Sequence, residues 1–286
     1  MLKYPSTGQY RDAVKWQSSY CNYHNVPTPT VTFEGTCKLH GSNLSLTRPI
    51  AGTANDIVIQ SRERIISVES DNAGAAVWST GNRATLNDIF DRVATAVKAD
   101  FPSDTTLQIV GEWCGGNIQK GVGLNQLPKM FVVFAIRIAV DPEDAGKFWL
   151  SKSALIDAVA PSTKEDLFHS YQFPTWTVDV DFNRPDIAQN RIAELTQLVE
   201  DRCPVSHQLL GDRAVGELIG EGLVWTPVAP DGAVYHDIRG LRFKSKGDKH
   251  VGAEHIIGLT LTPTDKERVM RALRGGGGRS FDFRFD

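Results

Sequence analysis

Residues 36–43 read TCKLHGSN and come at the end of a strand-like run. Lys38 is followed two places later by His-Gly, then by a small hydroxyl residue and an asparagine. This order is typical of a nucleophilic lysine at a corner between a strand and a turn. The glycine allows the backbone to approach a phosphate closely, and the side chains beside it can contact ribose and phosphate oxygens.

Hydrophobic periodicity on both sides of this stretch indicates short strands mixed with helices. The strongest apolar run, 129–140, reads KMFVVFAIRIAV and predicts a central strand, because it is rich in β-branched and aromatic residues. Thr85 is a candidate N-cap for a helix over 85–98. The other expected strands are 29–35, 43–48, 56–60, 106–110, 175–182, 222–225 and 241–243, and the other expected helices are 150–158 and 185–202, with 10–24 as a helix or a packed lid. Since strands and helices are interspersed irregularly, we expect an α+β fold of largely antiparallel sheets flanked by helices.

The composition is that of an ordinary globular protein, with 286 residues, 41% hydrophobic and 23% charged. No stretch approaches the roughly 20 apolar residues of a membrane span, and the N-terminus lacks the apolar core of a secretory signal. The four cysteines are widely spaced without a C-x-x-C pair, so we expect neither a zinc site nor a disulfide framework, and a reducing cytoplasm is the natural setting. The net charge of −3 argues against nonspecific coating of nucleic acid but is compatible with a local basic groove.

Six residues follow Lys38 in an order that points to one chemistry. They are Arg62, Glu112, Phe134, Glu221, Lys244 and Lys246. With Lys38 they resemble the covalent nucleotidyltransferases, which comprise ATP-dependent RNA and DNA ligases and capping enzymes. The Lys-x-His-Gly-Ser-Asn motif, with His40 where DNA ligases and capping enzymes usually have Asp, resembles the RNA ligase 2-type family, and so does GEWCGGNIQKGV at 111–122. The resemblance covers roughly residues 4–250.

The resemblance implies a nucleotidyltransferase (ATP-grasp-like) domain over residues 1–250. Only 40 residues follow Lys246, too few for the five strands of an OB-fold, so we expect no OB-fold. We expect residues 251–274 to form a short C-terminal extension packed on the domain. Residues 275–286 begin with four glycines, and we expect them to be a flexible tail of a monomeric protein.

The resemblance also implies ATP-dependent RNA ligation through a lysyl-AMP intermediate. The AMP would move from Lys38 to a 5′-phosphate RNA end, and a 3′-hydroxyl would then displace it. The partners would be RNA ends, in a nicked duplex or in single strands, with no membrane, in the cytoplasm (the host cytoplasm for a viral protein). Two alternatives stay open: a DNA ligase or mRNA guanylyltransferase-like enzyme, and a catalytically lapsed nucleic-acid-binding module.

Lys38 must attack the α-phosphorus as a neutral amine, although a free lysine has a pKa of about 10.4. Nearby cations and a bound metal would lower that pKa. Lys244 and Lys246 are one residue apart and share a face of a strand, so they can supply positive charge and grip the α-phosphate. The alternative is a solvated pair of lysines on a surface strand.

By the same resemblance, Glu221 would hold Mg²⁺ or Mn²⁺ near the α-phosphate, because hard ions prefer carboxylate, water and phosphate oxygens. Glu112 would accept a hydrogen bond from a ribose hydroxyl. Phe134 would stack on adenine, a contact worth about 1–3 kcal/mol per base. The plainer alternatives are a turn glutamate, an exposed glutamate at a strand end and a core phenylalanine, which is the explanation we favour for Phe131.

The remaining candidates would contact the nucleotide or the RNA. Asn43 would bind ribose or a metal-bound water, and His40 would orient a phosphate or such a water, with a structural hydrogen bond as its alternative. Arg62 would contact ribose, phosphate or the RNA end, and Arg64, which has the same strand parity, is its rival. Lys120 follows a glycine-rich loop and would meet an RNA phosphate, unless it is an ordinary surface lysine.

Two positions depart from the family pattern. Ala135 stands where an acidic residue often follows the stacking aromatic, and Thr226 stands where a lysine usually follows the second glutamate. The preference for ATP is therefore inferred from the resemblance alone. The remaining histidines, including His236, His250 and His255, are expected to be surface or structural.

Overall fold

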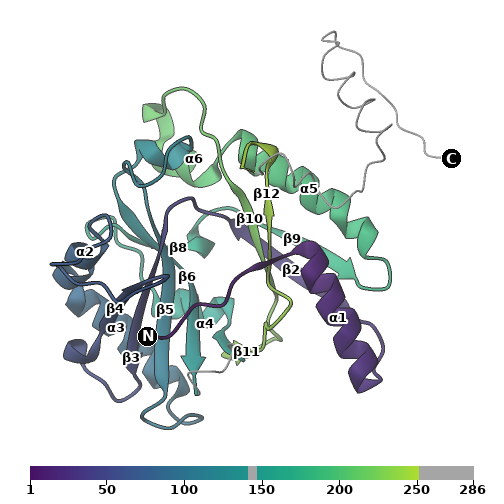
Figure 1. Ribbon diagram of the computed structural model, residues 1–286, viewed down its shortest axis with the longest axis horizontal. Coiled ribbons are helices and arrows are strands. Elements are labelled where there is room, and N and C mark those ends of the chain that lie inside the picture. The colour runs from purple at the N-terminus through teal and green to yellow at the C-terminus, as the bar shows by residue number, and fades with distance from the viewer. Residues whose placement is uncertain (141–146, 251–286) are drawn as a thin grey trace. The chain divides into compact units, whose positions relative to one another are not determined.

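Two open β-sheets carry the fold, which is seen in a computed structural model whose described residues are 1–140 and 147–250 (Figure 1). The first sheet has the order β1-β12-β10-β2-β9, and the second has the order β11-β7-β6-β5-β3-β4, with β8 pairing β6. Apart from the β1–β12 and β6–β8 pairs, the ladders are antiparallel. The expected α+β architecture is confirmed.

The bounds of the strands agree with most of the periodic segments of the sequence. The first sheet consists of β1 (Gly8–Gln9), β2 (Thr30–Cys37), β9 (Thr175–Asp181), β10 (Gly222–Pro227) and β12 (Phe243–Lys246). The second consists of β3 (Ser42–Pro49), β4 (Val58–Ser61), β5 (Thr106–Cys114), β6 (Met130–Ala139), β7 (Phe148–Leu150), β8 (Leu167–His169) and β11 (Tyr235–His236).

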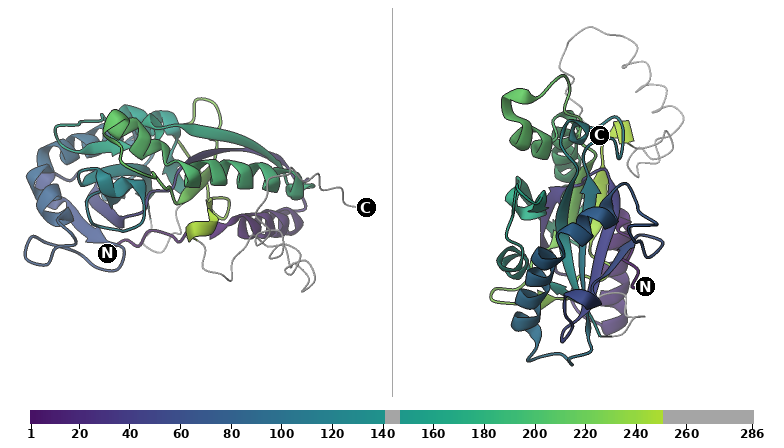
Figure 2. Two further views of the ribbon diagram at one scale, coloured as in Figure 1. Left: turned by 90° about the horizontal axis from the view of Figure 1, so that it is seen from above. Right: turned by 90° about the vertical axis from the view of Figure 1, so that its left-hand side faces the viewer.

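Each sheet has its own helices. Helix α5 (Pro185–Asp201) packs on β9, β10 and β12, and α1 (Tyr10–His24) packs beside β12. Helices α2 (Ala75–Gly81), α3 (Arg83–Val97) and α4 (Lys152–Ala158) belong to the second sheet, and α6 (Pro204–Leu210) follows α5. Figure 2 shows the blue α2 and α3 at the opposite end of the described chain from the purple α1.

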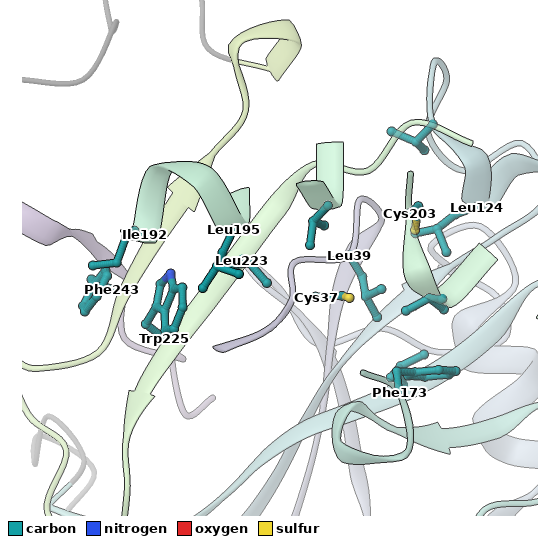
Figure 3. Close-up of a cluster of buried hydrophobic side chains, with 14 of the residues drawn as sticks. Cys37, Leu39, Leu124, Phe173, Ile192, Leu195, Cys203, Leu223, Trp225 and Phe243 are labelled. Carbon is teal, nitrogen blue, oxygen red and sulfur yellow. The ribbon is translucent and has the colours of Figure 1, made fainter. Parts of the chain in front are cut away.

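Alternation along the first sheet separates its core side from its open side. Cys37 and Leu39, which flank Lys38, are buried in one apolar cluster with Leu223, Trp225 and the residues of α5 beneath them (Figure 3). Because successive side chains of a strand point to opposite faces, Lys38 and Val224 project from the other face. The core therefore fixes the lysine by burying the residues on both sides of it.

A bulge interrupts the central strand of the second sheet. Val110 pairs with Ala135 and Gly111 pairs with Val133, so Phe134 is the extra residue on β6. Phe131 and Val133 face the apolar cluster under α3, whereas Phe134 packs with Val110 and Ala135 in a separate small cluster. Bulges re-aim side chains in this way, and here the bulge leaves Phe134 partly exposed in a strand that is otherwise buried.

Three details of the sequence prediction were wrong. Helix α3 begins at Arg83 with Asn82 as its N-cap, and the hydroxyl of Thr85 instead contacts Glu165. The strand predicted to end before Glu112 continues through it to Cys114, because the β3–β5 ladder extends that far. The expectations for 251–274 and 275–286, and for His255, lie outside the described residues.

Candidate active site

A cavity of about 440 Å³ opens where the two sheets face each other. Eight of the candidate residues line it: Lys38, His40, Asn43, Arg62, Glu112, Phe134, Glu221 and Lys244. Lys246 lies next to it through Glu221, and Arg64 and Lys120 do not line it. The structure thus brings together most of the residues that the sequence order singled out.

Strand register explains how the first sheet presents its charges. Val224 pairs with Thr36 on one side and with Lys244 on the other, so these three side chains form a row across the sheet. One step further along, the backbone N–H of Lys38 donates to the carbonyl of Gly222, which is paired with Lys246. Lys38, Lys244 and Lys246 therefore share one face, as their spacing predicts.

Glu221 is the electrostatic centre of the site. Its Oε2 lies 2.7 Å from Nζ of Lys38 and 3.1 Å from Nδ1 of His40, and its Oε1 lies 2.8 Å from Nζ of Lys246. The side chain is only 2% exposed. Burial works to raise the pKa of the Glu221 carboxyl, but Lys38 and Lys246 outweigh it, so the pKa is lowered. The carboxylate is thus held ionised in the protein interior.

The positive charge also acts on its neighbours. Burial lowers the pKa of Lys244, and Lys246, Lys38 and Arg62 lower it further. Burial lowers the pKa of His40 although Glu221 opposes the shift.

A second histidine lies behind the first. The ring of His250 is 5.7 Å from that of His40, and its Nδ1 is 3.6 Å from Oε1 of the buried Glu200 on α5. His250 was expected to be surface or structural, and nothing in its local sequence indicates its place near the site.

Glu112 and Asn43 come from facing positions of β5 and β3. Burial raises the pKa of Glu112 to about 7, and Glu221 adds to the rise, while Lys38 and the backbone N–H of Gly41 oppose it. The alternative of an exposed glutamate at a strand end is wrong, because the residue lies within a strand and its carboxyl is largely withdrawn from water.

Phe134 contributes an aromatic face at the other end of the cavity. The ring of Tyr4 packs edge-on against it at 5.6 Å, and the guanidinium of Arg242 lies 5.3 Å from its centroid. Val224 lines the same cavity from the opposite sheet. The alternative assignment for Phe131 is confirmed, since it is fully buried in the core.

The N-terminal segment closes one side of this end. Gln60 and Gln108, both buried, donate to the carbonyl of Leu2, and Arg137 donates to that of Lys3. These bonds place residues 4–7 along the cavity. Sequence reasoning missed Tyr4, because no local pattern links the N-terminus to buried glutamines on β4 and β5.

The three candidates for RNA contact differ in their surroundings. Arg62 and Arg64 both follow β4 rather than lying in it. Arg62 is exposed and lines the cavity, whereas the guanidinium of Arg64 donates to the carbonyls of Ser70 and Asp71 within its own loop. Lys120 is exposed on the loop whose Gln119 donates to the carbonyl of Gly41.

The donor set for a metal ion is small. Within residues 1–140 and 147–250, no group of three or more His, Cys, Asp or Glu side chains is arranged to hold one. A site with one carboxylate, Glu221, and the nearby amide oxygen of Asn43 suits a hard divalent ion whose other ligands are water and phosphate oxygens. No helix of the described chain is long and apolar enough to cross a bilayer.

Comparison with known proteins gives matches to one family. The profile described as RNA ligase matches residues 31–246. A Naegleria gruberi RNA ligase mutant with ATP and Mn superposes with a TM-score of 0.51 at 16% identity, over 87% of this chain and 57% of that one. A second mutant of that ligase, with AMP and Mn, gives 0.51 at 16% identity, over 86% and 56%. The chain thus spans a little more than half of these structures, and no curated protein sequence matches it.

Proposed function

The chain belongs to the RNA ligase family, and from that premise we propose that it is an ATP-dependent RNA ligase that joins 5′-phosphate and 3′-hydroxyl ends through lysyl-AMP. The contact of Lys38 with Glu221 carries the proposal. A lysine at the mouth of a cavity, paired with a buried carboxylate and flanked by two more lysines, has the surroundings that phosphoryl transfer to an amine requires.

In the first step, Nζ of Lys38 attacks the α-phosphorus of ATP, a P–N bond forms, and pyrophosphate leaves. Lys244 and Lys246 neutralise the α-phosphate oxygens. Phe134 stacks on the base, and Glu112 accepts a hydrogen bond from a ribose hydroxyl. Mg²⁺ or Mn²⁺, held by Glu221 with Asn43 nearby, supplies further charge neutralisation when bound.

In the second step, a 5′-phosphate oxygen of the RNA attacks the same phosphorus and releases the lysine. In the third, a 3′-hydroxyl attacks the 5′-phosphate, and AMP leaves as the phosphodiester forms. Arg62 and Lys120 are the side chains we assign to the RNA, and His40 orients a phosphate through its hydrogen bond to Glu221.

Labelled ATP with Mg²⁺ or Mn²⁺ should leave AMP bound to the protein after denaturation, and Lys38→Ala should remove the label. Lys249→Ala is the matched control, because this nearby lysine is about half exposed and pairs with Glu217. Labelling of Lys38→Ala equal to that of the unmodified protein would overturn the assignment. Labelling by GTP in place of ATP would favour the guanylyltransferase alternative, and sealing of nicked DNA but not RNA would favour a DNA ligase.

A further inference from the structure

Two polar groups at the aromatic end of the cavity have no hydrogen-bond partner among the described residues. Ser170 is 5% exposed, and its Oγ is buried without a partner. Nε of Arg242 is likewise buried and without a partner. Both residues line the cavity together with Phe134 and Val224. Because buried polar groups in native proteins are nearly always paired, two such groups in one cavity indicate a missing polar ligand.

The fold holds Ser170 beside the stacking residue. Strand β8 runs parallel to β6 with His169 opposite Val133, so the next residue, Ser170, comes level with Phe134. Ser170 begins the short 3-10 helix Ser170–Gln172, which also packs against β2, the strand that carries Thr36. The hydroxyl therefore lies between the strands that form the two walls of the cavity.

Arg242 is held by aromatic rings. Its Nη1 donates to the hydroxyl of Tyr4, and its guanidinium lies 5.3 to 5.8 Å from the ring centroids of Phe134, Tyr4 and Trp149. A guanidinium always carries its charge and has no acceptor atom, so Nε can only donate. A rigid donor and a hydroxyl thus face the space beside Phe134.

We propose, on the basis of the nucleotide-binding function above, that Ser170 and Arg242 read the edge of the purine stacked on Phe134. Adenine presents its 6-amino donor next to the ring-nitrogen acceptors N1 and N7. Ser170 Oγ accepts from the 6-amino group, and Arg242 Nε donates to one of the two ring nitrogens. The pair selects a base whose donor lies beside an acceptor, and neither contact takes part in the transfer itself.

Atom-substituted nucleotides test this assignment without any chemistry. The probes are AMP, purine riboside 5′-monophosphate, 1-deaza-AMP and 7-deaza-AMP, with affinity measured by titration calorimetry on the full chain. The analogue without the 6-amino group should bind roughly tenfold more weakly than AMP, and Ser170→Ala should abolish that difference. One deaza analogue should show a similar loss, which Arg242→Met should abolish.

Equal binding of AMP and every analogue by the unmodified protein would overturn the inference, and so would analogue ratios that neither substitution changes. If Arg242→Met fails to fold, Arg242→Lys keeps the cation near Phe134 while removing Nε. Lysyl-AMP formation by the unmodified protein is measured in parallel. A protein that is labelled without discriminating the analogues contradicts only this inference, and one that discriminates them without labelling contradicts only the ligase proposal.

Discussion

Nζ of Lys38 lies 2.7 Å from Oε2 of Glu221, and the carboxylate that it neutralises is 2% exposed. The same carboxylate binds Lys246 through its other oxygen. One buried negative charge therefore balances two lysines, which are 22% and 33% exposed and keep partial access to water. The stability of this arrangement depends on how many of the two cations remain.

Replacing one lysine should be tolerated far better than replacing both. Lys38→Met and Lys246→Met each leave the other cation beside Glu221, and we expect each to lower the free energy of unfolding by about 1 kcal/mol. The double variant leaves a buried carboxylate with only His40 beside it, so its loss should exceed the sum of the two by more than about 1 kcal/mol. Urea unfolding at pH 7 measures all three.

The control is Lys3→Met, since Lys3 and Glu63 are 4.0 Å apart and more than 70% exposed. An exposed pair of this kind should change stability by under about 0.5 kcal/mol. Additive losses in the Lys38 and Lys246 double variant would mean that the two lysines act independently of a shared carboxylate.

Glu112 should make the free protein less stable as the pH rises. Its folded-state pKa of about 7 exceeds the ordinary value of 4.5, so the folded chain holds the proton more tightly than the unfolded chain. The stability that this proton contributes is complete below about pH 4.5 and is lost as the pH rises through 7, by at most about 3 kcal/mol. Glu112→Gln cannot titrate, so its stability relative to the unmodified protein should increase from pH 5 to pH 8.5.

Urea midpoints at four pH values across that range test the point. Glu69→Gln is the control, because that carboxyl is exposed and its pKa is lowered through a hydrogen bond with Ser67. Parallel curves for Glu112→Gln and the unmodified protein would show that the two states of Glu112 are equally solvated.

Much of the fold could be predicted because its strands carry their own periodicity. The runs at 29–35, 129–140 and 185–202 became β2, β6 and α5 with shifts of one or two residues at their ends. Helices α2 and α6 escaped prediction, since seven-residue helices give too short a pattern. The bulge at Phe134 was also invisible, because it arises from the pairing of β6 with β5 rather than from the composition of either strand.

The site divides in the same way. Residues within one motif, such as Lys38 with His40 or Lys244 with Lys246, could be placed by local spacing. The residues of the aromatic end could not, because Tyr4, Ser170 and Arg242 meet only after the two sheets and the N-terminal segment have packed. Val224 could have been found, since it lies between Leu223 and Trp225, which alternation sends into the core.

Arg62 and Arg64 should respond differently to substitution. Arg62 is exposed and lines the cavity, so Arg62→Ala should slow transfer of AMP to an RNA end at least tenfold while leaving the melting temperature unchanged. The guanidinium of Arg64 donates to Ser70 and Asp71. Arg64→Ala should therefore lower the melting temperature by loosening that loop, with the RNA affinity changed less. The reverse result would make Arg64 the RNA-binding residue of the two.

Gly41 should be intolerant of any side chain for a reason that lies in the protein rather than in the nucleotide. A Cβ at Gly41 would lie 2.4 Å from the carbonyl oxygen of Trp113 and 2.8 Å from Cβ of Cys114. Both belong to β5, which is paired on two sides and cannot move away. Gly41→Ala should therefore cost about 1–3 kcal/mol of stability and displace the corner that carries Lys38.

Gly81→Ala is the matched control. Gly81 ends α2, and a Cβ there would meet nothing within 4 Å, so the substitution should be neutral or should stabilise by up to about 1 kcal/mol. Lysyl-AMP formation should fall in Gly41→Ala well below the level set by its folded fraction, because the displaced lysine no longer reaches the α-phosphorus in line. A Gly41→Ala protein that labels at the full rate while losing stability would show that the corner's position is set by Cys37 and Leu39 alone.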